Sequence, residues 1–317
     1  MHDTTTSTAP QTAICTLFEG DYHYGLAAFV NSLFQAGYQG TVWVGYRGAL
    51  PPWLGQLQFT TEDGQQSYRV AERIRLVFLP VDPATHMTNY KPEFMLRLFR
   101  EQPIDYLWYF DPDIWLKFSW NFFARWQNYG IALCEEVVRH GLSARHPLRL
   151  QWADFGRTIG LGEPTLRPGY FNGGLVGLQR AHLSFLELWQ KIIAEAPRTG
   201  VDLGSFFTTA AEHIFAMQDQ DALNMATLYT PHPLTTLGPE GMGFTPGWNA
   251  MMHAVAHKPW RVNFFVRALG GVPPSNAMKT FFLHLNGPIR PYSKGQLFGR
   301  RLNCQLATLI GRFYRRG

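Results

Sequence analysis

The chain has 317 residues, of which 46% are hydrophobic and 16% charged, a balance that is typical of globular proteins and excludes a largely disordered chain. Six basic residues and no acid follow position 293, so the excess of positive charge lies in the C-terminal segment and not in the body of the chain. A nucleic-acid-binding domain would carry its positive charge on the fold itself, so we expect no nucleic-acid partner.

Residues 1–13 are polar and rich in Thr, and they lack the basic and apolar regions of a signal peptide. No apolar run approaches the roughly 18 residues that a membrane-spanning helix needs. The three cysteines, Cys15, Cys134 and Cys304, show neither a metal-binding spacing nor a paired framework. We therefore expect a cytoplasmic protein, either free or peripheral on the inner face of the membrane.

The first 135 residues alternate between two patterns. Apolar runs predict buried strands, and apolar residues repeating every three or four positions predict helices. In chain order we expect strands over 12–18, 41–45, 73–81, 104–110 and 131–134, and helices over 24–36 and 92–101. This alternation predicts a largely parallel sheet, whose ligands bind beyond the carboxyl ends of the strands.

The second half of the chain is less regular. We expect a long loop over 139–167, a strand over 171–178, helices over 182–196 and from 219 to 228, and a last strand over 279–285. Long loops in compact domains are often functional. The predicted organisation is a flexible N-terminus over 1–11, one α/β domain over 12–293 and a basic C-terminal helix over 294–317.

Two carboxylates end the apolar run over 104–110, in the triplet Asp111-Pro112-Asp113. At the carboxyl end of a strand they can converge on a hard cation such as Mg²⁺ or Mn²⁺, which prefers oxygen ligands and bridges to substrate phosphates. Because Asp and Pro are also common in solvated turns, the triplet alone fits a structural role too. Its position after a buried strand favours the metal site.

The segment 284–292, with the sequence HLNGPIRPY, follows the last predicted strand. His284 can complete a metal site with the two aspartates. Gly287 permits close approach of a ligand to the backbone, and Arg290 can clamp a diphosphate through two N–H groups. Taken alone, His284 fits an ordinary structural histidine as well.

Two further polar clusters lie in the second half. Asp219-Gln220-Asp221 begins a predicted helix, where such residues either cap the helix or hold sugar hydroxyls. Phe171-Asn172-Gly173-Gly174 precedes an apolar run and fits either a turn or a backbone segment that contacts a ligand.

Together these segments resemble the GT-A-fold glycosyltransferases of family 8, the glycogenin and lipopolysaccharide galactosyltransferase kind. The resemblance covers residues 12–292 and follows the order TLFEGDYHYGLAAFVNSL, YLWYFDPDIW, YFNGGLVG, DQDALN and HLNGPIRPY. The last motif is the most specific. It is similar to the family's H-x-x-G-x-x-K-P-W, with Arg290 in place of the Lys and Tyr292 in place of the Trp.

The resemblance implies a GT-A catalytic domain over 12–293, with a mixed, mostly parallel central sheet flanked by helices. It implies metal-dependent transfer of a sugar from a nucleotide-diphosphate sugar, with UDP as the expected nucleotide, to a glycan or other acceptor with retention of configuration. The cation, Mn²⁺ or Mg²⁺, would bind Asp111, Asp113 and His284. The donor would contact Thr16, Leu17, Lys91, Asp111, Asp113, Asn172, Gly173, Asp219, Gln220, Gly287 and Arg290, and of these Asp219 and Gln220 would lie at the reaction centre.

The C-terminal segment predicts an amphipathic helix. Leu302, Leu306, Leu309, Ile310 and Phe313 fall on one helical face, and most of the basic residues point elsewhere. Such a helix either lies on an anionic membrane or packs its apolar face on the domain. The first alternative would imply a lipid-linked acceptor, such as a lipopolysaccharide or another envelope glycan.

Three other functions fit less well. A sugar nucleotidyltransferase would open with a Gly-rich loop where this chain has residues 18–22, with the sequence FEGDY. A metal-dependent phosphohydrolase usually needs more clustered acids and histidines. A non-catalytic nucleotide-sugar or glycan-binding protein that kept the GT-A fold is the main alternative, although the intact residues Asp111, Asp113, Asp219 and His284 favour an enzyme.

Overall fold

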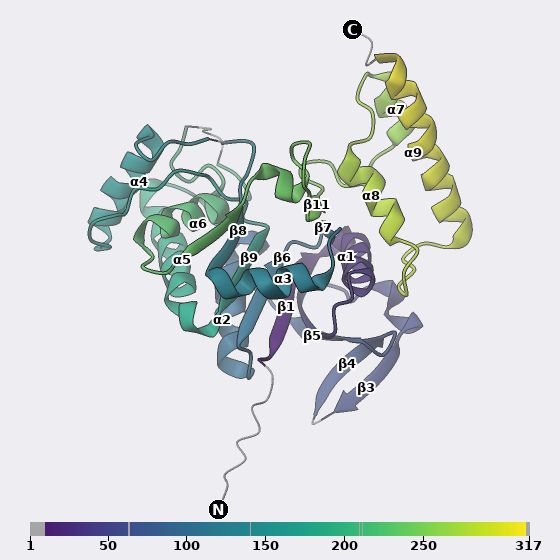
Figure 1. Ribbon diagram of the computed structural model, residues 1–317, viewed down its shortest axis with the longest axis horizontal. Coiled ribbons are helices and arrows are strands. Elements are labelled where there is room, and N and C mark those ends of the chain that lie inside the picture. Colours follow the sequence, from purple (N-terminus) through teal and green to yellow (C-terminus); the bar gives the residue numbers. More distant parts are fainter. Residues whose placement is uncertain (1–9, 63, 140, 209, 211, 315–317) are drawn as a thin grey trace, which may run out of the picture.

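The computed structural model describes residues 10–314 apart from 63, 140, 209 and 211. Most of the predicted flexible N-terminus lies outside the described residues, as do Arg315 and Arg316 of the basic segment. A nine-stranded sheet forms the centre of the described molecule, in the order β10-β8-β9-β6-β1-β2-β5-β4-β3 (Figure 1). A second, two-stranded sheet pairs β11 with β7.

The middle of the large sheet consists of four parallel strands, β5 (Ile74–Pro80), β2 (Gly40–Arg47), β1 (Thr12–Glu19) and β6 (Tyr106–Phe110). Their apolar runs are buried on both faces, as expected of parallel strands covered by helices. In β1, Ile14 and Phe18 contact one core cluster and Cys15 and Leu17 the other, because successive side chains point to opposite faces.

At both edges of the sheet, antiparallel pairs join the parallel strands of its middle. β9 (Leu175–Gln179) pairs antiparallel with β6 and β8 (Ile131–Cys134), and β10 (Leu234–Leu237) pairs parallel with β8. At the other edge the hairpin of β3 (Gln58–Glu62) and β4 (Gln65–Val70) continues from β5. The sheet is therefore mixed but mostly parallel, which confirms the predicted fold class.

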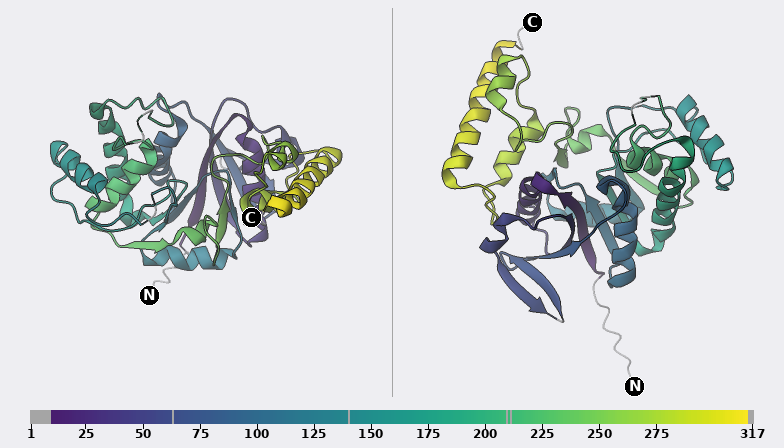
Figure 2. Two further views of the ribbon diagram at one scale, coloured as in Figure 1. Left: turned by 90° about the horizontal axis from the view of Figure 1, so that it is seen from above. Right: turned by 180° about the vertical axis from the view of Figure 1, so that it is seen from behind.

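Helices cover both faces of the sheet (Figure 2). On one face α1 (His23–Gln35), α3 (Trp120–Trp126) and α8 (Asn276–His284) contribute to the first core cluster. On the other face α2 (Lys91–Glu101), α4 (Pro147–Thr158), α5 (Leu183–Glu195) and α6 (Gln218–Tyr229) contribute to the second. This two-face covering leaves the ends of the parallel strands as the place for a ligand.

Two predicted elements were wrong. The segment 279–285 is not a strand but lies mostly in α8, where the Ser275 hydroxyl accepts a hydrogen bond from the Met278 amide and begins the helix. Its apolar residues Ala277, Met278, Phe281 and Phe282 recur at helical spacing and are buried. The expected loop over 139–167 contains α4, which starts with Pro147 at its first turn after the capping residue His146.

The small sheet consists of β7 (Ile114–Leu116), directly after the Asp111-Pro112-Asp113 triplet, and β11 (Met251–His253). The two strands pair antiparallel, with Ile114 opposite His253. This pairing brings a histidine that is 140 positions away in the chain next to the two aspartates.

The C-terminal segment forms α9 (Lys294–Tyr314), which packs against α7 (Phe264–Leu269) at one side of the molecule (Figure 1). The packed face of α9 contains Cys304 and Ala307, both buried, and Gly311, which lies against Pro273. The opposite face is exposed and apolar, with Phe298, Leu302, Leu306, Leu309 and Phe313. Among the described residues, no helix is both long and apolar enough to cross a membrane.

Candidate active site

The Asp111-Pro112-Asp113 triplet lies between the end of β6 and the start of β7. The Asp111 amide donates to the Gly174 carbonyl at 2.8 Å, and the Ile114 amide donates to the Asp111 carbonyl at 3.1 Å, so the triplet turns sharply while its backbone stays paired. The Asp113 side chain is 3% exposed and that of Asp111 is 22% exposed. One carboxylate is therefore desolvated and the other faces the open end of the strand.

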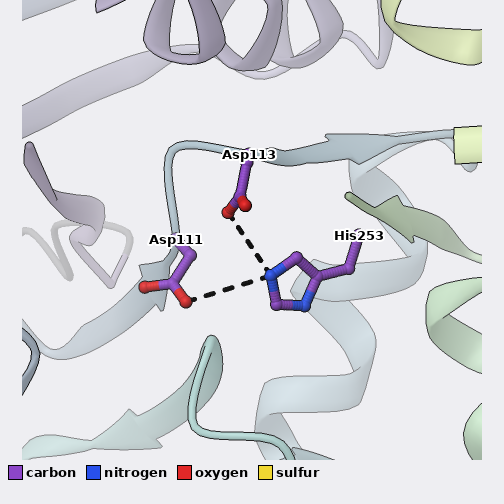
Figure 3. Close-up of side chains that lie close together, drawn as sticks. All are labelled: Asp111, Asp113 and His253. Atoms are coloured by element: carbon purple, nitrogen blue, oxygen red, sulfur yellow. Dashed lines mark ion pairs between the residues drawn. The ribbon is translucent and has the colours of Figure 1, made fainter. Parts of the chain in front are cut away.

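His253 completes a group of three side chains with these aspartates (Figure 3). Its Nε2 atom lies 3.3 Å from Asp113 Oδ1 and 4.0 Å from Asp111 Oδ2. The three candidate ligand atoms lie within 4.8 Å of one another, close enough to surround one cation. Two carboxylates and one imidazole suit Mn²⁺ or Mg²⁺, whose ligands are mainly oxygens.

The second ring nitrogen of His253 departs from the usual pattern. Metal-binding histidines commonly donate their other N–H to a carboxylate or carbonyl group. Nδ1 of His253 is buried and has no hydrogen-bond partner among the described residues. The ring is held instead by strand pairing and by Phe244, whose ring centroid lies 5.8 Å from that of His253.

Two glycines allow this close packing. A Cβ atom at Gly174 would lie 2.7 Å from Asp111 Oδ2 and 2.9 Å from His253 Cε1, so any larger residue would push the group apart. A Cβ atom at Gly25 would lie 2.6 Å from the Pro112 carbonyl oxygen, which places the first turns of α1 directly against the triplet.

Lys91 occupies the centre of the polar cluster. Its Nζ atom donates to Asp219 Oδ2 at 2.9 Å and to the Gly173 carbonyl at 2.9 Å, and it lies 3.2 Å from Asp111 Oδ1. Burial lowers the pKa of Lys91, but the carboxylates of Asp111 and Asp219 raise it further, so the net pKa lies above its usual range. The side chain is therefore a fixed, buried cation that links the triplet to α6.

Lys258 is a second cation at the site. Its Nζ atom forms an ion pair with Asp113 and donates to the Ala254 carbonyl at 2.8 Å. Burial would raise the pKa of Asp113, but Lys258 and His253 lower it well below its usual range. A divalent cation at Asp113 would therefore compete with Lys258 for the same carboxylate.

The predicted residues around the sugar position converge on the same place. The Gln220 side-chain oxygen accepts from the Gly173 amide at 2.8 Å, and the Asn172 side-chain oxygen accepts from the Gly174 amide at 2.9 Å. The Asn172 amide group in turn donates to Glu136. The structure thus brings together seven of the predicted residues, Lys91, Asp111, Asp113, Asn172, Gly173, Asp219 and Gln220.

The segment 284–292 lies elsewhere, along the length of α1. Nδ1 of His284 lies 2.7 Å from Gln35 Oε1 at the last residue of that helix. Asn31 pairs with both backbone groups of Ile289, and Tyr292 stacks on Tyr24 near the start of the helix at 4.7 Å between centroids.

The structure does not bring His284 to the two aspartates. Gly25 contacts the triplet, and Gln35, which contacts His284, follows ten residues later, which is about 15 Å along the helix axis. Burial lowers the pKa of His284 to about 4. The histidine that joins the aspartates is His253, and the predicted third ligand has to be corrected accordingly.

Gly287 and Arg290 have structural contacts in this segment. A Cβ atom at Gly287 would lie 2.2 Å from Asn31 Cγ, so glycine is needed there for packing on α1. The Arg290 backbone pairs with the Gln56 side chain, and Arg290 lines a separate cavity of about 570 Å³ together with His23 and Trp53. Their predicted contacts with the donor remain predictions.

Thr16 and Leu17 lie inside β1, before its carboxyl end at Glu19, and both are buried. The Thr16 hydroxyl is buried without a hydrogen-bond partner among the described residues. Their predicted contacts with the nucleobase and ribose also remain predictions.

Sequence reasoning missed His253 and Lys258. Both lie in residues 253–260, with the sequence HAVAHKPW, which ends in the same Lys-Pro-Trp as the pattern H-x-x-G-x-x-K-P-W and is one residue shorter. Ala256 stands where that pattern has its Gly, and its φ of 61° is the conformation that glycine favours. A signal for these residues was therefore present in the sequence, but the pattern was matched to 284–292 instead. The pairing of β11 with β7 shows which of the two segments lies beside the aspartates.

Comparison with models of known protein families finds no match, and comparison with curated protein sequences finds none either. Among solved structures, the apo structure of the WbbM bifunctional glycosyltransferase matches this chain with a TM-score of 0.55 and 15% sequence identity. The match covers 93% of this chain and 52% of that one, so this chain spans about half the length of its structural neighbour. The chain has a glycosyltransferase fold.

Proposed function

We propose that this protein is a metal-dependent glycosyltransferase that moves a sugar from a nucleotide-diphosphate sugar, with UDP as the nucleotide, to a glycan or other acceptor. One observation carries the proposal: in a glycosyltransferase fold, Asp111, Asp113 and His253 form a group that can hold a cation at the carboxyl end of β6. The buried Lys91 connects this group to Asp219.

The reaction breaks the bond between the anomeric carbon and the diphosphate, so negative charge develops on the leaving oxygen. A divalent cation at the Asp-Asp-His group would neutralise that charge. Lys258, paired with Asp113, would add a second positive charge beside the leaving phosphate. Preorganised cations of this kind stabilise the transition state without reorganising water.

The sugar carbon becomes positively charged as the bond breaks, and it needs electron-rich groups nearby. Asp219 and Gln220 are the residues that we assign to this position. Asp219 is paired with Lys91, and the Gln220 oxygen accepts from the Gly173 amide, so both are held in place by neighbours. Because neither is a free nucleophile, retention would proceed by front-side attack, with the acceptor proton passing to the leaving phosphate.

The test is a thermal-shift screen of nucleotide sugars with and without Mn²⁺, on wild type and on Asp113→Ala, followed by an assay of nucleoside diphosphate release. We expect stabilisation of wild type by a donor and Mn²⁺ together, and its loss in the variant. Equal stabilisation of both proteins would contradict the metal site. Donor binding without nucleoside diphosphate release from any donor would instead support the binding protein.

We further propose that the acceptor is lipid-linked and that α9 meets an anionic membrane at the inner face, in the cytoplasm. The exposed apolar face of α9, including Phe298, Leu302 and Phe313, has no described residue covering it. Basic residues in the same segment suit anionic headgroups. Flotation with phosphatidylglycerol vesicles tests this: wild type should bind and Phe298→Ser/Phe313→Ser should not, while equal recovery of both proteins would contradict it.

A further inference from the structure

A cavity of about 470 Å³ lies behind the metal-site histidine. One wall comes from β11 and the residues that follow it, including His253 and Ala254. Arg267 of α7 and Ser275 and Met278 at the start of α8 also line it. The volume falls within the range of small-molecule sites, roughly 300–1,000 Å³.

The titratable side chains among the described lining residues of this cavity are all basic. Arg267, His253 and His257 line it, and no Asp or Glu is among its described lining residues. Nη1 of Arg267 and Nδ1 of His253 are buried and have no hydrogen-bond partner within the part of the chain that the structure describes. Buried donors are nearly always paired in proteins, so an unpaired guanidinium N–H in a residue that lines a cavity points to a partner that the described residues do not supply. An oxyanion is the partner that guanidinium groups bind best.

The remaining lining suits a sugar ring next to such an anion. Phe244, Met252 and Met278 contribute apolar surface, while Thr245, Asn249 and Asn276 contribute neutral polar groups. The first turn of α8 also faces the cavity, and the positive end of a helix dipole favours an anion there.

The cavity and the proposed active site share one residue, His253. Nε2 of His253 faces Asp111 and Asp113, while His253 also lines the cavity. A ligand held by Arg267 would therefore lie on the far side of this histidine from the two carboxylates, separate from the donor residues Lys91 and Asp219, neither of which lines the cavity.

We propose that this cavity binds an acidic saccharide unit of the acceptor, away from the hydroxyl that reacts, and that Arg267 holds its carboxylate or phosphate group. The role as acceptor site rests on the proposed function. Binding of the acid itself does not, because it depends on the cavity and on Arg267 alone. A neutral sugar would leave the guanidinium unpaired and would bind more weakly.

The test measures binding of three monosaccharides, glucuronate, glucose 6-phosphate and glucose, to the full chain by ligand-observed NMR. We expect wild type to bind at least one of the two acids about tenfold more tightly than glucose, and the acid that binds identifies the group recognised. Arg267→Met should lose this preference, and Arg267→Lys should keep part of it. Equal binding of the acids and glucose, or unchanged acid binding in Arg267→Met, would overturn the proposal.

Two further variants keep the test decisive. Arg312→Met removes an exposed arginine of α9 and should bind acids as wild type does. If Arg267→Met does not fold, Thr245→Trp fills the cavity while leaving Arg267 intact, and it should abolish acid binding; retained binding would overturn the proposal.

The outcome is distinguishable from failure of the proposed function. Donor release with Mn²⁺ but no acid binding would sink the acidic acceptor site and leave the transferase intact. Acid binding without any donor release would sink the transferase and leave an anion site.

Discussion

β11 and the segment 284–292 each place a histidine against another element, but the surroundings differ. His253 faces two carboxylates and Lys258 stands beside them, so charges surround it. His284 faces the amide of Gln35, and burial lowers its pKa to about 4. A histidine beside carboxylates can bind a cation together with them, whereas a histidine packed against a helix contributes to the stability of the fold. Two segments of the chain are similar to the same histidine pattern, and their contacts in the fold show which of the two histidines lies beside the aspartates.

The largest expected effect is on activity and comes from changing Asp113, in the charged cluster around His253. Asp113→Asn keeps the shape of the side chain but removes its charge, so a cation there would lose a main ligand. We expect a loss of about a thousandfold in Mn²⁺-dependent kcat/KM, on the order of 4 kcal/mol. The measurement is initial rate of nucleoside diphosphate release against Mn²⁺ concentration. Retention of Mn²⁺-dependent activity would show that Asp113 does not hold the cation, and the surroundings of His253 would then differ from those of His284 in charge but not in function.

Lys91→Met tests the charged cluster through stability. It leaves Asp111 and the buried Asp219 without their cation, and breaking a buried pair on one side typically costs about 3–5 kcal/mol. We expect a loss of about 3 kcal/mol in the free energy of unfolding, measured in urea. The matched control is Arg290→Met, whose exposed side chain should contribute less than about 0.5 kcal/mol. Similar losses in both variants would contradict the account.

The buried His284 should make the free energy of unfolding depend on pH. Its folded pKa of about 4 lies below the ordinary value of 6.5, so the unfolded chain binds the proton first as pH falls. The stability from the neutral form is therefore complete above pH 6.5 and is lost as pH falls towards 4, by about 3 kcal/mol. His284→Gln should show a correspondingly shallower loss of unfolding free energy between pH 7 and pH 4. An unchanged slope would show that burial of this histidine is not what the pH dependence reports.

The smallest predicted effect sharpens the view of Lys258 as a competitor for Asp113. Lys258→Met removes the cation from that carboxylate, so Mn²⁺ should bind more tightly, by about tenfold or roughly 1.4 kcal/mol. Calorimetric titration of Mn²⁺ into wild type and variant measures it. Weaker binding in the variant would mean that Lys258 supports the site rather than competing for it.

Local patterns predicted much of the fold. The apolar runs of β1, β2, β5, β6 and β8 and the helical spacing of α1, α2 and α5 are strong signals because burial on one or two faces imposes a fixed period. The segment 279–285 misled because a short apolar run fits either a strand or a buried helix, and the capping role of Ser275 decides for the helix.

The candidate site was predictable only where its residues sit at strand or helix ends. Asp111 and Asp113 follow the carboxyl end of β6, while Asp219 and Lys91 lie at the starts of α6 and α2. Ligand sites of such sheets lie beyond the carboxyl ends of the strands, so residues at these ends were expected there. His253 begins the segment HAVAHKPW over 253–260, which is also similar to the pattern H-x-x-G-x-x-K-P-W, and the pairing of two three-residue strands is what places it beside the aspartates. The motif at 284–292 pointed to His284 because its spacing resembles a known pattern, while its contacts in the fold are with α1.

The most direct test of the central claim compares His253→Gln with His284→Gln by Mn²⁺ titration, at pH 7.5 and with both variants shown to be folded. We expect His253→Gln to weaken Mn²⁺ binding and donor cleavage by about tenfold or more, and His284→Gln to leave both within about twofold of wild type. Loss of Mn²⁺ binding in His284→Gln with unchanged binding in His253→Gln would contradict it.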